Sequence, residues 1–440
     1  MNSDSAGRDK SSRGIGLPGA LSIGIGGMIG GGIFAVLGEA VSLAHTATPI
    51  AFLIAGSVAL LTSYSYAKLS VHFQNQGGTV YFIDKAFGID LATGAVNLVL
   101  WLSYLVTISL YAVAFGSYAL TFFSDGDIPW LRHTLISAAI VVPAAINLFN
   151  ADFVGKSETV IVAAKLLILS VVIVSGFFFI HLPSSGDVPH TDTLGIVVAG
   201  MIIFVAYEGF ELIANAAQDV RNPERTLPLA FYGSVILVVL LYALVAYVVV
   251  GTVPESLVPQ VKDFVLAEAA KPALGDAGFT LVAIAALLAT LSAINATIYG
   301  NARLGYVLAM DGELPDLLDR KVWNKPVAGV LAVAILSLLI ANLIDLTAIA
   351  IIASAGFLLI FAVTNAAATW LAREIGAKWW IPALACFACL ASLTVLLLRT
   401  YTDQPRAIWI FAGAFLASLC FELIYPRLSG RPMRMNGISE

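Results

Sequence analysis

One lysine stands inside an apolar run that is long enough to cross a bilayer. Lys165 lies within Ile161-Val-Ala-Ala-Lys-Leu-Leu-Ile-Leu-Ser170, and the run extends from about Val160 to Ile180. A charged ammonium in hydrocarbon costs roughly 2.5–3.5 kcal/mol on insertion scales. We therefore expect Lys165 to face the protein interior, where burial lets a lysine exchange its proton near neutral pH. The alternative is that Lys165 snorkels to the interface from near the start of its run.

Two interruptions in other apolar runs are the natural partners of this lysine. The first is Gly24-Ile-Gly-Gly-Met-Ile-Gly-Gly-Gly-Ile-Phe34, and the second is Tyr207-Glu-Gly-Phe-Glu211. Glycine lets the backbone leave helical geometry, and a broken helix offers free N–H groups to a carboxylate and free C=O groups to an ammonium. Together the breaks predict a receptor for the zwitterionic end of an amino acid. The alternative is that the small residues only allow close helix packing.

Twelve apolar runs position these residues. They cover residues 17–43, 48–70, 92–122, 133–150, 160–180, 193–216, 228–251, 278–309, 327–344, 347–371, 379–398 and 406–425. We expect an all-α membrane protein, because no run alternates and an unpaired sheet edge cannot persist in lipid. The breaks fall in the first and sixth runs, which enter the membrane from opposite sides. This pattern predicts two inverted five-helix repeats with discontinuous helices 1 and 6.

The predicted division of the chain follows from these repeats. It comprises a cytoplasmic N-terminal segment (1–16), a first repeat of spans 1–5 (17–180), a second repeat of spans 6–10 (193–371), spans 11 and 12 (379–425) and a cytoplasmic tail (426–440). If the N-terminus is cytoplasmic, the basic residues on the outer side are Arg132, Lys262, Lys271, Arg399 and Arg406, out of 23 Lys and Arg in all. This imbalance predicts a multi-pass protein of the cell membrane with both termini inside.

Composition excludes several classes of protein. Of the 440 residues, 59% are hydrophobic and 12% charged, and the mean hydropathy is +0.92. A soluble domain carries about 25% charged residues, so we expect one integral membrane domain. No basic cluster is interleaved with aromatic residues, which argues against a nucleic-acid partner. The runs hold no catalytic Ser/His/Asp spacing, and we expect no enzyme.

The cysteines and histidines give no convincing metal site. Cys386-Phe-Ala-Cys389 has the spacing of a ligand pair, but no His, Asp or second cysteine pair accompanies it. We interpret these cysteines, and Cys420, as small hydrophobic residues in membrane helices. We therefore predict that the protein binds no metal.

Several motifs resemble those of the amino acid–polyamine–organocation (APC) superfamily of transporters. The matching stretches are Gly27-Met-Ile-Gly-Gly-Gly-Ile-Phe34, Ser65-Tyr-Ala-Lys-Leu69, Gly77-Gly-Thr-Val-Tyr81, Tyr207-Glu-Gly-Phe-Glu211, Asn222-Pro-Glu-Arg-Thr-Leu-Pro228 and Asp311-Gly-Glu-Leu-Pro315. Three stretches resemble proton-coupled amino acid transporters of that superfamily nearly residue for residue: Ala164-Lys-Leu-Leu-Ile-Leu169, Asn295-Ala-Thr-Ile-Tyr-Gly300 and Asp311–Trp323. The resemblance implies a LeuT-type fold with a substrate site between spans 1, 3, 6, 8 and 10.

The same resemblance implies roles for particular residues. The implied substrate-binding residues are Ile29, Gly30, Gly31, Gly32, Val205, Ala206, Tyr207 and Glu208. The substrate carboxylate would meet the amides of Gly30, Gly31 and Gly32, and its amine the carbonyls of Val205, Ala206 and Glu208. Lys165 would replace the sodium ion of sodium-coupled relatives. Its expected partners are Gly26 and the hydroxyl of Ser292, with Thr290 as the alternative hydroxyl.

We therefore expect proton-coupled symport of amino acids of broad specificity, small neutral ones such as alanine, by alternating access. No cofactor is expected, and sodium coupling is disfavoured because an ammonium at Lys165 would repel a second cation. The expected partners are the amino acid and membrane lipid, and the protein is expected to be monomeric. A sensor that binds without transport is disfavoured, because no signalling domain is attached.

Glu208 keeps a second function open, a sodium-independent exchanger of basic amino acids or polyamines. The family usually has an apolar residue at this position of the second break. The carboxylate of Glu208 can contact a second amino group, pair with Lys165 or join a proton path, or be hydrogen-bonded away from the site. The neighbouring Glu211 matches the family motif, and we interpret it as structural.

Overall fold

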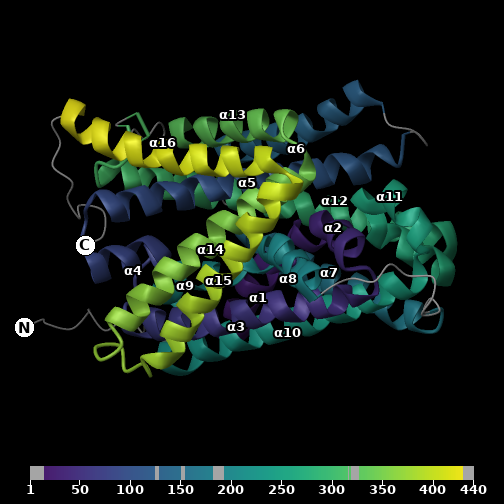
Figure 1. The fold of residues 1–440 in the computed structure, drawn as a ribbon, viewed down its shortest axis with the longest axis horizontal. Coiled ribbons are helices and arrows are strands. Elements are labelled where there is room, and N and C mark those ends of the chain that lie inside the picture. Colours follow the sequence, from purple (N-terminus) through teal and green to yellow (C-terminus); the bar gives the residue numbers. More distant parts are fainter. Residues whose placement is uncertain are drawn as a thin grey trace, which may run out of the picture.

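The computed structural model describes residues 14–123, 128–149, 154–181, 193–315, 317–318 and 327–429. Within these ranges the chain is helical. Ile15 and Val220 form an isolated parallel bridge, and the described residues contain no strand. Most helices run along the long axis of the molecule (Figure 1).

The first half of the chain forms seven α-helices. In the residues that the structure describes, they are α1 (Leu17–Met28), α2 (Gly32–Ala44), α3 (Thr48–His72), α4 (Gly78–Phe87), α5 (Leu91–Leu120), α6 (Pro129–Phe149) and α7 (Val154–Phe177), and the short 3-10 helix η2 (His45–Ala47) precedes α3. Several of these helices begin with residues that favour a helix N-terminus. A proline stands in the first turn of α1 and of α3. The carboxylate of Asp90 caps α5 by accepting from the N–H groups of Ala92 (2.9 Å) and Thr93 (3.0 Å).

The second half is more interrupted. Its elements are α8 (Thr193–Ile202), η4 (Ile203–Glu211), α9 (Leu212–Asn215), η5 (Ala217–Asp219), α10 (Pro223–Thr252), η6 (Glu255–Leu257), α11 (Val258–Val261), η7 (Lys262–Phe264), α12 (Val265–Met310), α13 (Val327–Leu343), α14 (Leu346–Trp370), α15 (Trp380–Asp403) and α16 (Pro405–Ser429). Gly275 has φ +63° and divides α12 into two helices. Its second part corresponds to the predicted run 278–309, and its first part was not predicted.

The described helices fit a multi-pass membrane protein. Ten are long and apolar enough to cross a membrane by length and composition, and Leu17–Met28 and Val327–Leu343 are shorter apolar helices. Each of the twelve predicted runs contains a described helix. The helix α4 is additional; it is too short and too polar to be recognised as a membrane span.

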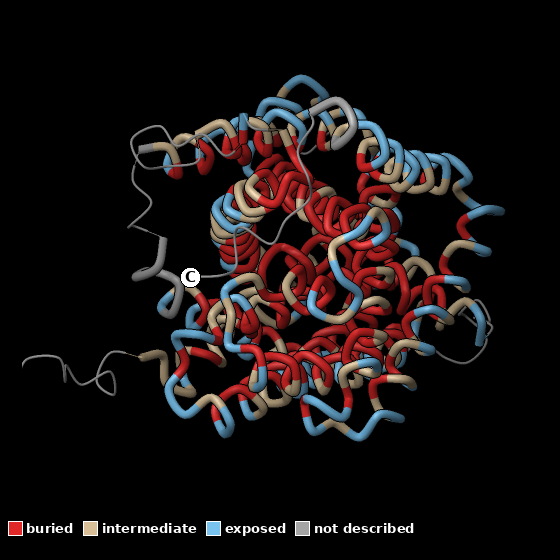
Figure 2. The backbone as a smooth tube through the Cα atoms, turned by 90° about the vertical axis from the view of Figure 1, so that its left-hand side faces the viewer, coloured by how far each residue is buried: buried red, intermediate tan, exposed pale blue. Residues whose placement is uncertain are grey.

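The two ends of the molecule differ. Helix α4 and both ends of the described chain lie at one end, the left of Figure 1, and α11 lies at the other. We call these ends the α4 face and the α11 face. Viewed onto the α4 face, buried backbone fills the centre and exposed residues line the periphery (Figure 2). In the most apolar 18-residue stretch of α5 and of α14, 83% of the residues are buried, whereas in that of α16 only 17% are. Helices α5 and α14 therefore lie at the centre of the bundle.

The two glycine-rich breaks cross in direct backbone contact. A Cβ atom on Gly209 would lie 2.1 Å from the carbonyl carbon of Gly27, and one on Gly27 would lie 2.6 Å from the carbonyl oxygen of Gly209. No side chain fits between these two backbones. Glycine at both positions is therefore required by the close approach of α1 to η4.

The substitution Gly209→Ala is expected to lower the thermal stability of the purified protein in detergent. Overpacking a core typically costs about 1–3 kcal/mol, and here the obstructing atoms are backbone and cannot rotate away. The control is Gly300→Ala on α12, where an added Cβ meets nothing within 4 Å. Alanine favours a helix, so this control should melt at or above the wild-type temperature. Equal melting temperatures for the two variants would contradict the crossing.

Candidate functional site

The first break lies where the glycine stretch predicts it. Helix α1 ends at Met28, α2 begins at Gly32, and the residues between them are a turn. The N–H of Ile29 still bonds to the carbonyl of Ile25 (2.7 Å). The carbonyl of Met28 accepts a hydrogen bond from the hydroxyl of Tyr242 on α10 (2.7 Å). A side chain from another helix thus stabilises the end of α1.

The second break is longer than the motif predicts. The motif itself covers 207–211, and the interrupted segment expected from the sequence runs from Phe204 to Glu211; the 3-10 segment η4 begins one residue earlier, at Ile203. The reason is Ser354 on α14. Its hydroxyl donates to the carbonyl of Ile202 (2.7 Å) and accepts from the N–H of Val205 (3.0 Å). A distant serine therefore satisfies backbone groups that an α-helix would have paired internally.

The two breaks adjoin each other at the predicted substrate residues. A Cβ on Gly32 would lie 2.9 Å from the Cα of Ala206, so α2 begins directly against η4. A Cβ on Gly31 would lie 2.2 Å from the ring of Tyr111. All eight predicted substrate residues, 29–32 and 205–208, are buried. The structure thus brings them together, beside a tyrosine of α5 that sequence reasoning missed.

Nothing in the sequence singles out Tyr111, which is one aromatic residue within a long apolar span. In the fold it covers Gly31 and is 2% exposed. Ala293 of α12 is a second neighbour of the first break, because a Cβ on Gly30 would lie 2.9 Å from its methyl group. Helices α5 and α12 therefore line the junction of the two breaks.

Glu208 is hydrogen-bonded to α5. Its carboxylate accepts from the hydroxyls of Thr107 and Tyr111, each at 3.2 Å, and the residue is 5% exposed. Both donors lie on α5, whereas Lys165 lies on α7. Of the three alternatives left open by the sequence, the structure supports a hydrogen-bonded carboxylate. One of its donors, Tyr111, also packs its ring against Gly31 of the first break.

Glu211 ends the 3-10 segment and binds three hydroxyl groups. Its carboxylate accepts from Tyr66 on α3 (3.1 Å), from Thr79 on α4 (3.0 Å) and from Tyr104 on α5. Glu211 therefore ties η4 to three neighbouring helices. This arrangement accords with the structural role that its motif suggested.

Lys165 faces the interior of the helix bundle. It is 3% exposed and lies on the same side of α7 as the buried residues Val162, Leu169 and Val172. Burial of the whole residue argues against snorkelling. Helix α7 packs against α1 and α12, which carry the predicted partners of Lys165.

Those partners differ in their surroundings. Gly26 is buried in α1, and Ser292 is half-buried in α12. The alternative hydroxyl, that of Thr290, donates to the carbonyl of Ala286 in its own helix (2.7 Å). This bond uses the proton of the hydroxyl and leaves its oxygen able to accept from an ammonium, so both Ser292 and Thr290 stay candidates.

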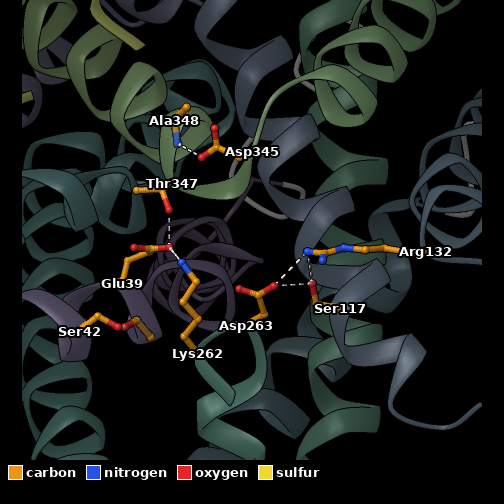
Figure 3. A network of polar contacts seen from close by, with 10 residues as sticks. Glu39, Ser42, Ser117, Arg132, Lys262, Asp263, Asp345, Thr347 and Ala348 are labelled. Atoms are coloured by element: carbon orange, nitrogen blue, oxygen red, sulfur yellow. Dashed lines mark hydrogen bonds and ion pairs between the residues drawn. The ribbon is translucent and has the colours of Figure 1, made fainter. Parts of the chain in front are cut away.

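The α11 face is closed by charged side chains (Figure 3). Glu39 on α2 accepts from the ammonium of Lys262 on η7 (2.8 Å) and from the hydroxyl of Thr347 on α14 (2.5 Å). A Cβ on Gly38 would lie 1.9 Å from the carbonyl oxygen of Lys262, so η7 rests directly on α2. Beside this contact, Arg132 of α6 pairs with Asp263 of η7 (3.0 Å).

The α4 face is closed by backbone hydrogen bonds. The N–H of Ile15 donates to the carbonyl of Asp219 (2.7 Å), and the N–H of Arg221 donates to the carbonyl of Ile15 (2.9 Å). The segment before α1 is thereby attached to the connection between η5 and α10. Between these two sets of contacts, the residues at the junction of the breaks are buried.

The cysteines of α15 lie in the helix packing. Cys389 is buried beside Thr62 of α3 (3.5 Å) and Asn365 of α14 (3.6 Å), and Cys386 is partly buried. Within the described ranges, no group of three or more His, Cys, Asp or Glu side chains is arranged to hold a metal ion.

Comparison with known proteins gives a consistent result. The family model described as amino acid permease matches residues 15–412. An uncharacterised protein of Methanocaldococcus jannaschii is 36% identical over 423 residues, covering 95% of this chain and 96% of that protein. The Escherichia coli inner membrane transport protein YbaT is 32% identical over 418 residues, covering 94% and 96%. Cationic amino acid transporter 9 (chloroplastic) of Arabidopsis thaliana is 29% identical over 330 residues, covering 70% and 57%.

The Ser354→Ala variant tests how the second break is held. It leaves the carbonyl of Ile202 and the N–H of Val205 buried without their side-chain partner, and each such group costs about 1–3 kcal/mol. We expect a clear loss of thermal stability in detergent. The matched control is Ser57→Ala, because the exposed hydroxyl of Ser57 bonds only to Leu53 in its own helix. If both variants melt like the wild type, Ser354 does not stabilise the break.

Proposed function

The chain belongs to the amino acid permease family, and on this premise we propose that it is a proton-coupled symporter that takes up small neutral amino acids such as alanine. It is a transporter and not an enzyme. The observation that carries the substrate class is the junction of the two breaks, where backbone groups of α2 and η4 adjoin within a buried site.

The proposed site holds the two charges of an amino acid main chain. Gly32 begins α2, and Gly30 and Gly31 directly precede it. The N–H groups at this end of the helix lie at the positive end of its dipole, so Gly30, Gly31 and Gly32 bind the carboxylate. The carbonyls of Val205, Ala206 and Glu208 bind the ammonium. Ile29 and Tyr207 complete the two segments. The methyl of Ala293 beside Gly30 leaves little room there, which favours a small side chain on the substrate.

The proposed transport mechanism is alternating access in a LeuT-type fold of twelve spans, with two inverted repeats and two further helices. The α4 face is then the cytoplasmic face, and both termini are cytoplasmic. Two observations support this orientation. Most Lys and Arg residues lie in the connections predicted to be on the same side of the membrane as the termini. In the structure, both ends of the described chain lie at the α4 face (Figure 1). Substrate exchange requires opening of one closed face at a time.

Lys165 is the proposed proton carrier. When protonated, it ties α7 to Gly26 of α1 and to Ser292 of α12, and this favours the substrate-competent arrangement of the first break. Release of the proton to the cytoplasm weakens the tie and frees α1. Two observations support this role: Lys165 is buried, and its helix packs against α1 and α12, which carry Gly26 and Ser292.

The decisive experiment is uptake of radiolabelled alanine into sodium-free proteoliposomes. We expect accumulation only with an inward proton gradient. Lys165→Ala should abolish gradient-driven accumulation and retain exchange of internal for external alanine, because the substrate site itself is unchanged. Lys378→Ala, at an exposed lysine, serves as the control and should accumulate alanine normally. A Lys165→Ala protein that still accumulates alanine would rule out proton coupling through this residue.

An exchanger of basic amino acids or polyamines is the second candidate function. Two observations favour it: Glu208 places a carboxylate at the junction of the breaks, and relatives of lower identity are named cationic amino acid transporters. Such a protein would use Glu208 to bind the second amino group of its substrate.

Competition separates the two functions. For the neutral symporter, excess arginine or putrescine should leave alanine uptake unchanged. Glu208→Gln should preserve the preference for alanine, because the glutamine oxygen can accept from one of the hydroxyls of Thr107 and Tyr111 and its NH2 group can donate to the other. For the exchanger, arginine should displace alanine in the wild type and lose that ability in Glu208→Gln. Uptake would then also require substrate inside the vesicles.

A further inference from the structure

Three carboxyl groups from separate elements are buried together near the α4 face. They belong to Asp84 on α4, Glu313 in the segment after α12, and Glu422 on α16, which are 2%, 1% and 2% exposed. Asn97 of α5 lies among them. Its amide nitrogen is 3.1 Å from Asp84 Oδ1 and 3.2 and 3.3 Å from the two carboxylate oxygens of Glu313. Glu422 packs on α5, since a Cβ on Gly94 would lie 2.6 Å from its carboxyl carbon.

This cluster has too few hydrogen-bond donors. The side-chain amide of Asn97 supplies two N–H bonds, and those go to Asp84 and Glu313. The amide oxygen of Asn97 and both carboxylate oxygens of Glu422 are buried with no hydrogen-bond partner. Within the described part of the chain, no ion pair joins Asp84, Glu313 or Glu422 to a cation. Three ionised carboxylates cannot be buried this way without a large energetic cost.

The surrounding charges are also acidic. Asp90, between α4 and α5, and Asp311, between α12 and Glu313, both act on the cluster. Burial raises the pKa of Asp84 to about 7, against a partial offset from the Asn97 hydrogen bond. Burial also raises the pKa of Glu313 well above its usual value, and the charges of Asp84 and Glu422 add to the effect. Each influence other than Asn97 therefore favours a protonated carboxyl group.

We propose that Asp84, Glu313 and Glu422, gathered around Asn97, form a proton-binding site at the α4 face, separate from Lys165. One proton from water converts one carboxylate into a carboxylic acid, and no other reactant is needed. The new O–H donates to the amide oxygen of Asn97 or to a neighbouring carboxylate. The proton thus supplies the missing donor and removes one of the repelling charges.

The position of α4 gives this proton a mechanical consequence. Thr79 in the first turn of α4 donates to Glu211 at the end of η4, and Asp84 lies in the last turns of the same helix. Protonation at Asp84 therefore holds α4 between the second break and α5. Loss of the proton restores the repulsion between Asp84 and Glu313 and loosens α4. If the α4 face is cytoplasmic, as the proposed function has it, a rise in cytoplasmic pH then eases opening of that face.

The site is tested by thermal unfolding between pH 5.5 and 8.5 in detergent. The native cluster binds its proton more tightly than the unfolded chain does, so wild-type stability should fall as the pH rises through about 7. Asp84→Asn and Glu313→Gln carry neutral side chains of the same shape and should flatten this dependence. Glu224→Gln, at an exposed position of α10, is the control and should keep the wild-type slope. Unchanged slopes in both cluster variants would overturn the proposal.

Two further measurements keep the test independent of folding defects and of transport. Infrared difference spectra of the wild type should show a protonated carboxyl band that disappears as the pH rises, and Glu422→Gln should alter it. Added Mg²⁺ or EDTA should leave the pH profile unchanged; stabilisation by Mg²⁺ at pH 8 would instead identify the site as a metal site and overturn the proton assignment. Neither measurement uses uptake, so the result stands or fails separately from the coupling role of Lys165.

Discussion

The constraint on which this structure depends is that every backbone polar group inside a membrane needs a partner. A helix broken at mid-membrane violates that constraint unless other helices supply donors and acceptors. Here Tyr242 of α10 satisfies the carbonyl of Met28, and Ser354 of α14 satisfies the carbonyl of Ile202 and the N–H of Val205. The two breaks are therefore stabilised by the whole bundle and not by their own residues alone.

The same constraint explains the different environments of the two carboxylates in the second break. In a 3-10 segment, residues three apart lie above one another, yet Glu208 and Glu211 reach different partners. Glu211 accepts from hydroxyls on α3, α4 and α5 and anchors the end of the segment. Glu208 meets α5 beside Gly31, through Tyr111. One carboxylate thus anchors the end of the break, and the other is hydrogen-bonded to α5 beside the first break.

Local sequence patterns predicted helices in the apolar runs and the glycine break after Met28, because these depend on residues close together in the chain. Burial of Lys165 was predicted from the cost of a charge in hydrocarbon, and the structure confirms it. The part that Ser354 plays in the second break was not predictable, since this residue lies far along the sequence. Neither were the positions of Tyr111 and Asn97, which look like ordinary residues of an apolar span until α5 is packed. Glu313 stood in a recognised motif, but its burial against Asp84 depends on tertiary contacts.

The two closures of the molecule have different physical character. At the α11 face, η7 is held on α2 by the ion pair of Lys262 with Glu39, whose strength depends on charge and solvent exposure. At the α4 face, the segment around Ile15 is held by backbone hydrogen bonds that carry no titratable group. Such a seal cannot itself sense protons. Buried titratable side chains lie on the elements around this seal: Lys165 is on α7, which packs against α1, and Asp84 is on α4.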